Sequence, residues 1–163
     1  MIRIDKIMLS PLFRDYMGRI AAKEIARKFC CHDLHHLVDT ARITYILVLE
    51  NNYSEELKKD IVYGAALLHD IGRWREYETG EDHAVVGAQL AMPILKEAGY
   101  NNKEIELICK GILEHRNLPQ KPSTLGYYLY KGDKLSRPCF SCQARSECYK
   151  IDKMEIKDKI LTY

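Results

Sequence analysis

Histidine and aspartate side chains recur along this 163-residue chain in an order that suits a metal site. In chain order they are His36, the adjacent pair His69 and Asp70, His83, His115 and Asp133. Imidazole nitrogens and carboxylate oxygens are ligands for divalent ions such as Mn²⁺, Fe²⁺, Ni²⁺ and Zn²⁺. An ion held in this way lowers the pKa of a bound water molecule from ~15.7 to about 7, which makes it a nucleophile at neutral pH. The pattern therefore predicts an enzyme rather than a scaffold.

The positions of the two aspartates support this interpretation. Asp70 follows the aliphatic run GAALL at 64–68, and a helix that is apolar on all sides is buried. A buried carboxylate is costly unless it is paired or bound to a metal. Asp133 similarly follows a largely apolar stretch at 127–130. His69 and Asp70 are thus expected to emerge from the interior at a helix end, where both can reach one ion.

Helical periodicity dominates the chain, with no convincing strand and no internal repeat. Helices are expected over residues 12–29, 33–50, 54–68, 83–98, 101–115 and 123–135, with a charged helical tail at 152–161. Asp33, Asp82 and Asn101 or Asn102 suit N-caps, and Gly99 suits a C-terminal cap. The polar stretch 73–82 is expected to be a loop. The predicted fold class is an all-α bundle of about six or seven helices.

The chain is expected to form a single domain, 1–163, with a core at 32–137 and a cysteine-containing extension at 138–163. The net charge of +2 gives no field that would recruit a nucleic-acid polymer or an anionic membrane. No apolar run approaches the roughly 18–20 residues that span a bilayer, and the first residues lack the apolar core of a signal peptide. A cytoplasmic protein is therefore expected, and a homodimer is left open.

The sequence HDIG at 69–72, preceded by His36 and followed by His83, His115 and GDKLS at 132–136, resembles the HD-domain superfamily of metal-dependent phosphohydrolases. The resemblance covers about residues 32–137. It implies an all-α HD-type bundle and a metal shell of His36, His69, Asp70 and Asp133. The ion would be Mn, Fe, Ni, Mg or Zn, with one or two ions per site.

The resemblance leaves the roles of the other histidines open. It implies that His83 and His115 either bind a second metal or contact a substrate phosphate. Asp70 is the natural bridge if two ions bind, and a single tightly held metal is slightly favoured. His32, one helical turn before His36, competes for the first position or lines the pocket. His35 lies about 100° around the helix and is expected outside the site.

The activity implied by the resemblance is hydrolysis of a phosphate ester or anhydride in a nucleotide or another small phosphorylated metabolite. Asp70 or a neighbouring carboxylate is the expected proton acceptor, while Arg73 and Lys134 are the expected cations beside the phosphoryl oxygens. Arg116 and Arg137 are weaker candidates for that role. Trp74 and Tyr77 either stack on a nucleobase or belong to the packing. The alternatives are a diiron HD-fold oxygenase and a non-catalytic, metal-stabilised ligand-binding module.

Cysteines form a second group of candidate ligands. The chain has six cysteines and no export features, so they are expected to be thiols or metal ligands rather than disulfides. Cys139, Cys142 and Cys148 form a CxxC pair followed by a third cysteine, a spacing that suits zinc or part of an iron–sulfur cluster. A fourth ligand would come from Cys109, Cys30, Cys31 or another group. Plain reduced thiols are the alternative.

Overall fold

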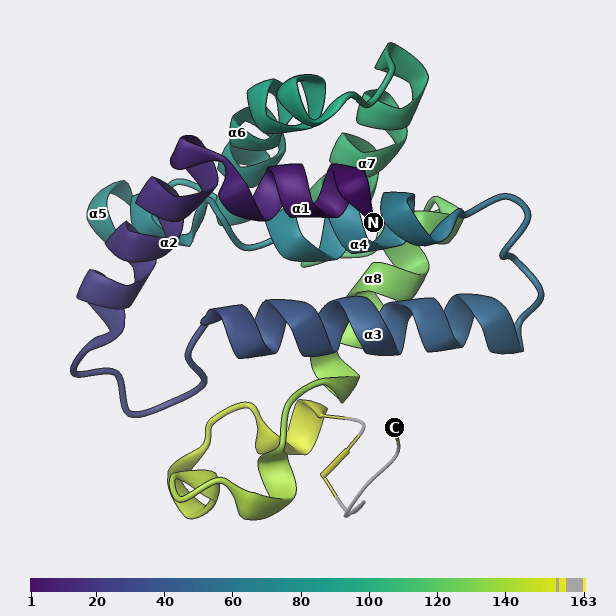
Figure 1. Cartoon of the computed structure of the whole chain (residues 1–163). Helices are drawn as coiled ribbons and strands as arrows, with labels where there is room; N and C mark the ends of the chain where they lie inside the picture. Colours follow the sequence, from purple (N-terminus) through teal and green to yellow (C-terminus); the bar gives the residue numbers. More distant parts are fainter. Residues whose placement is uncertain (155, 158–162) are drawn as a thin grey trace.

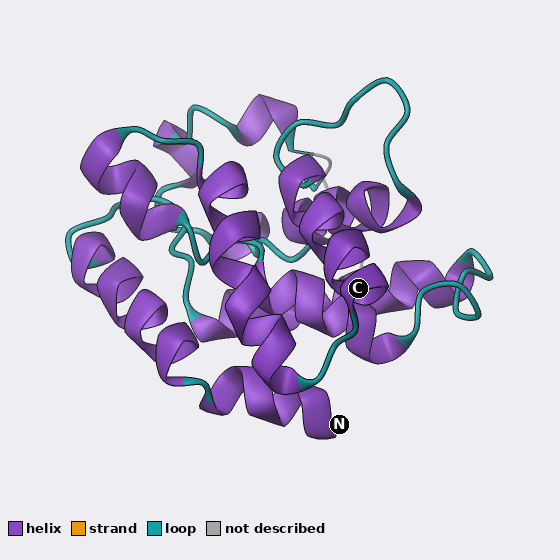
Figure 2. Ribbon diagram, turned by 90° about the horizontal axis from the view of Figure 1, so that it is seen from above, coloured by secondary structure: helices purple, strands orange, loops and turns teal. Residues whose placement is uncertain are grey.

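The computed structural model describes residues 1–154, 156–157 and 163. These residues form eight α-helices and three 3₁₀ helices and contain no strand (Figure 2), which confirms the all-α prediction. The α-helices are α1 (Ile2–Leu9), α2 (Pro11–Glu24), α3 (Leu34–Glu50), α4 (Lys59–Leu68), α5 (Arg73–Thr79), α6 (His83–Ala98), α7 (Asn102–Glu114) and α8 (Thr124–Leu135). The 3₁₀ helices are η1 (Cys139–Ser141), η2 (Arg145–Glu147) and η3 (Ile151–Lys153). Within the described residues no helix is both long and apolar enough to span a bilayer.

Helix α4 lies at the centre of the bundle, because it is apolar on nearly every side. Its buried residues include Ile61, Val62 and the whole run 64–68. It contacts α1, α3, α6, α7 and α8, and the long helix α3 runs beside it and α8 (Figure 1). Each large aliphatic side chain buried in this way contributes roughly 1.5–3 kcal/mol. The helix ends at Leu68, so the next two residues leave it inside the protein.

Helix caps fix the starts of the helices that carry the candidate site. The Asp33 side chain accepts a hydrogen bond from the backbone N–H of His36, and Asp82 accepts one from Ala84. Asn101 and Glu104 form a reciprocal capping box at the start of α7. These three caps were predicted from the sequence, and so was the C-terminal cap Gly99, whose φ of 94° is in the left-handed region.

Several predicted boundaries are wrong. The helix expected over 12–29 ends at Glu24, and the next residue, Ile25, is 88% exposed although its position fits the apolar period of that helix. The helix expected from residue 54 begins at Lys59, after a turn. The loop expected over 73–82 contains α5, which ends at Gly80 with a φ of 77°. Helix α1 was not predicted. Most of the tail predicted at 152–161 lies outside the described residues.

Two glycines allow the helices of the candidate site to approach closely. A Cβ atom on Gly72 would lie 2.6 Å from the backbone nitrogen of Gly87 in α6, closer than two such atoms can come. A Cβ atom on Gly132 would lie 3.1 Å from the Cα atom of Thr44 in α3. The first contact brings the α4–α5 turn against α6, and the second brings α8 against α3. Both bring ligand-bearing segments together.

Candidate metal centre

Four of the predicted ligands converge between α3, the end of α4 and α8. One ligand atom each from His36, His69, Asp70 and Asp133 can be chosen so that all four lie within 4.8 Å of one another. His36 Nε2 lies 3.1 Å from Asp133 Oδ1, and His69 Nε2 lies 3.1 Å from Asp70 Oδ2. His69 and Asp70 are 0% and 1% exposed. The geometry therefore brings together the side chains that the sequence pattern selected.

Asp70 also belongs to a second group of donors. Its Oδ2 atom faces His36 and His69, whereas its Oδ1 atom lies 3.4 Å from His83 Nε2 and 3.8 Å from His115 Nε2. Asp70, His83 and His115 form a second set whose ligand atoms lie within 4.8 Å of one another. The carboxylate thus stands between two clusters of imidazoles, where it could bridge two ions.

Hydrogen bonds at Nδ1 determine which ring nitrogen each histidine offers. Carbonyl oxygens only accept, so His69 Nδ1 donates to the Ala66 carbonyl and His115 Nδ1 donates to the Ile112 carbonyl, both at 2.6 Å. His83 Nδ1 donates to Glu76 Oε2 at 2.8 Å. A neutral imidazole protonated at Nδ1 carries its lone pair at Nε2. Nδ1 is therefore the nitrogen of these three histidines that holds a proton in the neutral ring, and Nε2 is the nitrogen that faces the centre.

His36 follows the same rule through a hydroxyl group. The Ser136 hydroxyl donates to the Asp133 carbonyl at 2.8 Å, so its oxygen accepts from His36 Nδ1 at 3.1 Å. His36 Nε2 then accepts from Arg137 Nη2 at 2.7 Å. The guanidinium group of Arg137 is thus the cation next to the Nε2 lone pair of His36.

The centre contains polar atoms that lack a partner and suit a divalent cation. Among the described residues, His69 Nε2 and Asp70 Oδ2 are buried and have no hydrogen-bond partner. Two lone pairs also face each other, since His83 Nε2 lies 3.2 Å from His115 Nε2. Leaving such groups unpaired in the interior costs free energy, and a bound cation removes that cost. The residues present therefore fit the metal that this donor set implies.

The electrostatic field of the centre favours positive charge. Burial alone would raise the pKa of Asp70, but His69 and Arg73 hold it well below its usual range. Burial alone would lower the pKa of His69, but the carboxylates of Asp70 and Asp133 overcome this and raise it to about 10. Burial lowers the pKa of His83 to about 2, with a contribution from Arg73. Ionised carboxylates beside a neutral His83 are the ligand forms that a metal requires.

Two carboxylates that sequence reasoning did not single out orient the histidines. Glu76 accepts from His83 as described above, and it also accepts from Arg73 Nη1 at 3.1 Å and Arg116 Nη1 at 2.6 Å. Carboxylates of this kind fix the tautomer and the orientation of ligating histidines. The sequence shows only that α5 contains two glutamates and two arginines, which does not reveal the contact.

Glu24 plays the corresponding role for His32. Its Oε1 atom accepts from His32 Nδ1 at 2.5 Å and from the Tyr77 hydroxyl at 2.5 Å. His32 is buried, and its Nε2 lies 3.8 Å from Asp70 Oδ2, at the edge of the ligand group. The side chain of His35 is 95% exposed and lies outside the cluster. His32 therefore lies at the edge of the centre and lines the cavity beside it.

Two of the predicted cations, Arg73 and Arg137, lie beside the carboxylates of the centre. Arg73 Nε donates to Asp70 Oδ1 at 2.8 Å, and Arg137 Nη2 lies 3.5 Å from Asp133 Oδ1. Lys134 places its ammonium group 3.2 Å from the centroid of the Tyr130 ring. A cavity of about 120 Å³ opens beside the centre. Its lining includes His32, Asp133 and the five cationic residues Arg27, Arg73, Lys134, Arg137 and Lys150.

The two aromatic residues proposed for base stacking have packing roles. Trp74 is 8% exposed, and its ring stacks on Tyr16 at a centroid distance of 6.2 Å. The Tyr77 hydroxyl is held by Glu24. Cys139, Cys142 and Cys148 line a neighbouring cavity together with Cys30, and His36 lines that cavity too. Cys30, Cys139 and Cys148 also line the cavity beside the centre.

Comparison with known proteins agrees with this geometry. The family model described as HD domain matches residues 33–138. An uncharacterised protein of Clostridium beijerinckii is 38% identical over 148 residues, which cover 91% of this chain and 92% of that protein. No solved structure matches this chain significantly.

Shorter stretches resemble larger enzymes. A stretch of 62 residues, 38% of this chain, is 36% identical to 7% of a bifunctional uridylyltransferase/uridylyl-removing enzyme of Mycobacterium tuberculosis. A stretch of 58 residues, 36% of this chain, is 40% identical to 11% of ribonuclease Y of Acidothermus cellulolyticus. The family match covers most of the chain and contains the first and last predicted ligands. This chain therefore belongs to the HD-domain family, within the superfamily of metal-dependent phosphohydrolases.

Proposed function

We propose that this protein hydrolyses a phosphate ester or anhydride in a small phosphorylated metabolite, such as a nucleotide, with a divalent metal. The observation that carries the proposal is the convergence of His36, His69, Asp70 and Asp133, with the buried atoms His69 Nε2 and Asp70 Oδ2 lacking any other partner. A divalent ion bound there supplies an activated water molecule and polarises the phosphoryl group. In this proposal Asp70 is also the proton acceptor.

The small cavity beside the centre supports a phosphoryl group as the reacting part. Arg73, Lys134 and Arg137 line it together with Asp133. Positive side chains stabilise the negative charge of the phosphoryl oxygens as it redistributes during hydrolysis. The cavity volume of about 120 Å³ is well below the roughly 300–1,000 Å³ of pockets that enclose a drug-sized molecule. This supports a substrate whose phosphate enters the site while the rest of the molecule lies outside it.

The test is phosphate release from a panel of nucleoside phosphates, dinucleoside polyphosphates and cyclic nucleotides, each assayed with Mn²⁺, Fe²⁺, Ni²⁺, Mg²⁺ or Zn²⁺. For cyclic nucleotides the opened monoester is measured. The Asp70→Ala variant is expected to lose the activity, while Glu106→Ala, which removes an exposed carboxylate on α7, retains it.

Two outcomes would contradict the proposal. One is turnover that survives in Asp70→Ala. The other is the lack of turnover with every ester and every metal; oxygen consumption by the iron-loaded protein in that case would favour the oxygenase alternative, for which the two donor groups around Asp70 provide room for two ions.

A further inference from the structure

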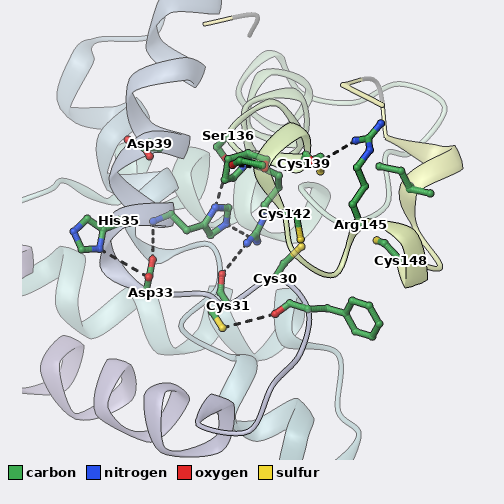
Figure 3. Close-up of a pocket in the computed structure, with 16 residues that line it drawn as sticks. Cys30, Cys31, Asp33, His35, Asp39, Ser136, Cys139, Cys142, Arg145 and Cys148 are labelled. Carbon is green, nitrogen blue, oxygen red and sulfur yellow. Dashed lines mark hydrogen bonds and ion pairs between the residues drawn. The ribbon is translucent and has the colours of Figure 1, made fainter. Parts of the chain in front are cut away.

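Four cysteine side chains from two distant segments line one cavity of about 330 Å³. Cys30 lies in the connection between α2 and α3, while Cys139, Cys142 and Cys148 lie in the segment after α8. Figure 3 shows the Cys142 side chain directed toward Cys30. The cysteine segment, defined here as residues 136–154, thus meets the α2–α3 connection at a surface rich in sulfur.

Contacts on both sides of the cavity hold these two segments together. Lys28 Nζ lies 2.5 Å from Glu147 Oε2. The ring of Phe29 meets the ring of Tyr149 edge to face, with centroids 5.6 Å apart. Arg137 Nη1 donates to the Cys31 carbonyl at 2.7 Å. Cys30 is therefore brought to the other three cysteines by specific contacts on either side of it in the sequence.

The four side chains share one environment of low polarity. All six cysteines of the chain are free, and Cys139 is buried while Cys30, Cys142 and Cys148 are half-buried. Burial raises the pKa of Cys139, and the neighbouring thiols of Cys30, Cys148 and Cys142 raise it further. Several thiols gathered in one partly buried place are a potential ligand set, because a bound metal deprotonates them outright.

The other two cysteines are directed elsewhere. Cys31 is exposed, and its Sγ atom donates to the Phe29 carbonyl at 3.7 Å, away from the other sulfurs (Figure 3). Cys109 lies on α7, where its Sγ atom donates to the Ala88 carbonyl at 3.3 Å. The structure therefore selects Cys30 among the fourth ligands that the sequence left open.

The spacing of the sulfur atoms argues against a preformed site for a single ion. Zinc binds thiolates at about 2.3 Å, so two sulfurs on one ion can be at most about 4.6 Å apart. In the part of the chain that the structure describes, which includes all six cysteines, no three cysteine sulfurs lie within 4.8 Å of one another. An iron–sulfur cluster places its cysteines on separate iron atoms and therefore needs a wider spread.

We propose that Cys30, Cys139, Cys142 and Cys148 bind an iron–sulfur cluster. The cluster joins the α2–α3 connection to the cysteine segment, immediately beside the HD centre. Ser136 and Arg137, which contact His36, begin that segment, so the cluster anchors the two residues that hold this side of the centre. This inference does not depend on the proposed phosphohydrolase activity.

The experiment is to purify the full chain without oxygen and to measure iron, zinc and acid-labile sulfide per chain. Sulfide is decisive, because iron bound by histidines and carboxylates in the HD centre brings none. Wild-type protein is expected to contain sulfide, at least as much iron as sulfide, and to show visible absorption. Cys142→Ser is expected to lose the sulfide, whereas the matched control Cys31→Ser retains it. Asp70→Ala, which disrupts the HD centre, should also retain it.

Two results would overturn the cluster. One is wild-type protein without sulfide, whether it contains zinc bound by the cysteines or six thiols that react with a thiol reagent. The other is a Cys142→Ser variant that keeps the full sulfide content. If Cys142→Ser does not fold, the wild-type sulfide measurement and the Cys31→Ser control still decide the matter. Loss of phosphate release in Asp70→Ala with sulfide intact separates the two sites.

Discussion

The HD centre and the cysteine segment lie next to each other, yet different forces hold their ligands in place. In the HD centre the candidate ligands lie on α-helices or directly after their ends, and the neighbouring Leu67 and Leu68 are 2% and 0% exposed. In the cysteine segment only three-residue 3₁₀ helices order the backbone, and Cys139 and Ala144 are its buried apolar residues. A segment that buries so little apolar surface gains its order from cross-links or metals.

If the cysteines bind the proposed cluster, one chain builds two metal sites whose ligands are held in place in different ways. Apolar burial shapes the HD centre before any metal binds. The free energy gained by the apolar core therefore offsets the destabilisation from the unpaired polar atoms. The proposed cluster instead contributes directly to the order of the segment that holds it. The two sites should therefore respond differently to substitutions.

The largest effect is expected from Asp133→Asn. Asp133 Oδ1 lies within 3.1 Å of His36 Nε2 and 3.7 Å of His69 Nε2, so the change removes a negative charge from the donor group. Phosphate release and metal content at the HD centre should fall by more than about 100-fold, since even residues that orient ligands matter by 10–100-fold. Sulfide content should stay at the wild-type level. A parallel loss of sulfide would show that the two sites are not independent.

A smaller loss is expected from Glu76→Gln. The change weakens the acceptor that holds His83 Nδ1 at 2.8 Å while preserving the size of the side chain. We expect the rate of phosphate release to fall roughly 10-fold, mainly in kcat, with an unchanged far-ultraviolet spectrum. Glu78→Gln on the same helix removes a carboxylate that pairs with Lys23 and is the matched control. Equal effects of the two changes would argue against an orienting role for Glu76.

Cys142→Ser should loosen the cysteine segment and leave the helical bundle in place. Trypsin is expected to cleave after Arg145 and Lys150 about ten times faster than in the wild type, because local opening becomes easier. Circular dichroism should show an unchanged helix content. Cys31→Ser is the control, since the Cys31 thiol contacts only the nearby Phe29 carbonyl among the contacts described for it. A collapse of helix content would mean that the bundle also depends on this segment.

Gly132→Ala tests the close approach of α8 to α3. The added methyl group would lie 3.1 Å from the Thr44 Cα atom, so the helices must separate. We expect a loss of about 1–3 kcal/mol in the free energy of unfolding, measured in urea. Gly18→Ala in α2 is the control, because a Cβ atom there meets nothing within 4 Å. That change should stabilise the protein by roughly 0.5–1 kcal/mol.

The smallest effect concerns the acid stability of the bundle. Burial alone would raise the pKa of Glu24, but hydrogen bonds from His32 and Tyr77 lower it from 4.5 to about 2. The stabilisation from this group is therefore complete above pH 4.5 and is lost as the pH falls toward about 2. Glu24→Gln should lower the thermal midpoint of unfolding at pH 6. Between pH 4.5 and about 2, the midpoint of the variant should fall less steeply than that of the wild type. Glu55→Gln, at a carboxylate that is 91% exposed, should follow the wild type.

The parts of the fold that local chemistry governs were predictable from the sequence. Asp33, Asp82 and Asn101 cap their helices as expected, because capping depends on residues within one turn. Helix α5 was missed because its seven residues, RWREYET, are too few and too polar to show an apolar period. The end of α2 was misplaced because Ile25 fits the apolar period and yet points to solvent.

The convergence of the four candidate ligands agrees with the sequence pattern, whereas the residues that contact and orient them could not be predicted. The order of His36, His69, Asp70 and Asp133 carries a family resemblance, which the family match and the geometry now support. Glu24 and Glu76 act through contacts between segments, which only the packed helices reveal. Cys30 could likewise be selected over Cys31 only once the direction of each thiol was known.

The position of Asp70 between two groups of imidazoles has a thermodynamic consequence. A single carboxylate carries one negative charge, and two cations, if both bind beside Asp70, would repel each other. The first ion therefore weakens the hold on the second, and by linkage the second weakens the first to the same degree. Occupancy of the pair should show negative cooperativity, with the population of doubly loaded protein set by the supply of metal.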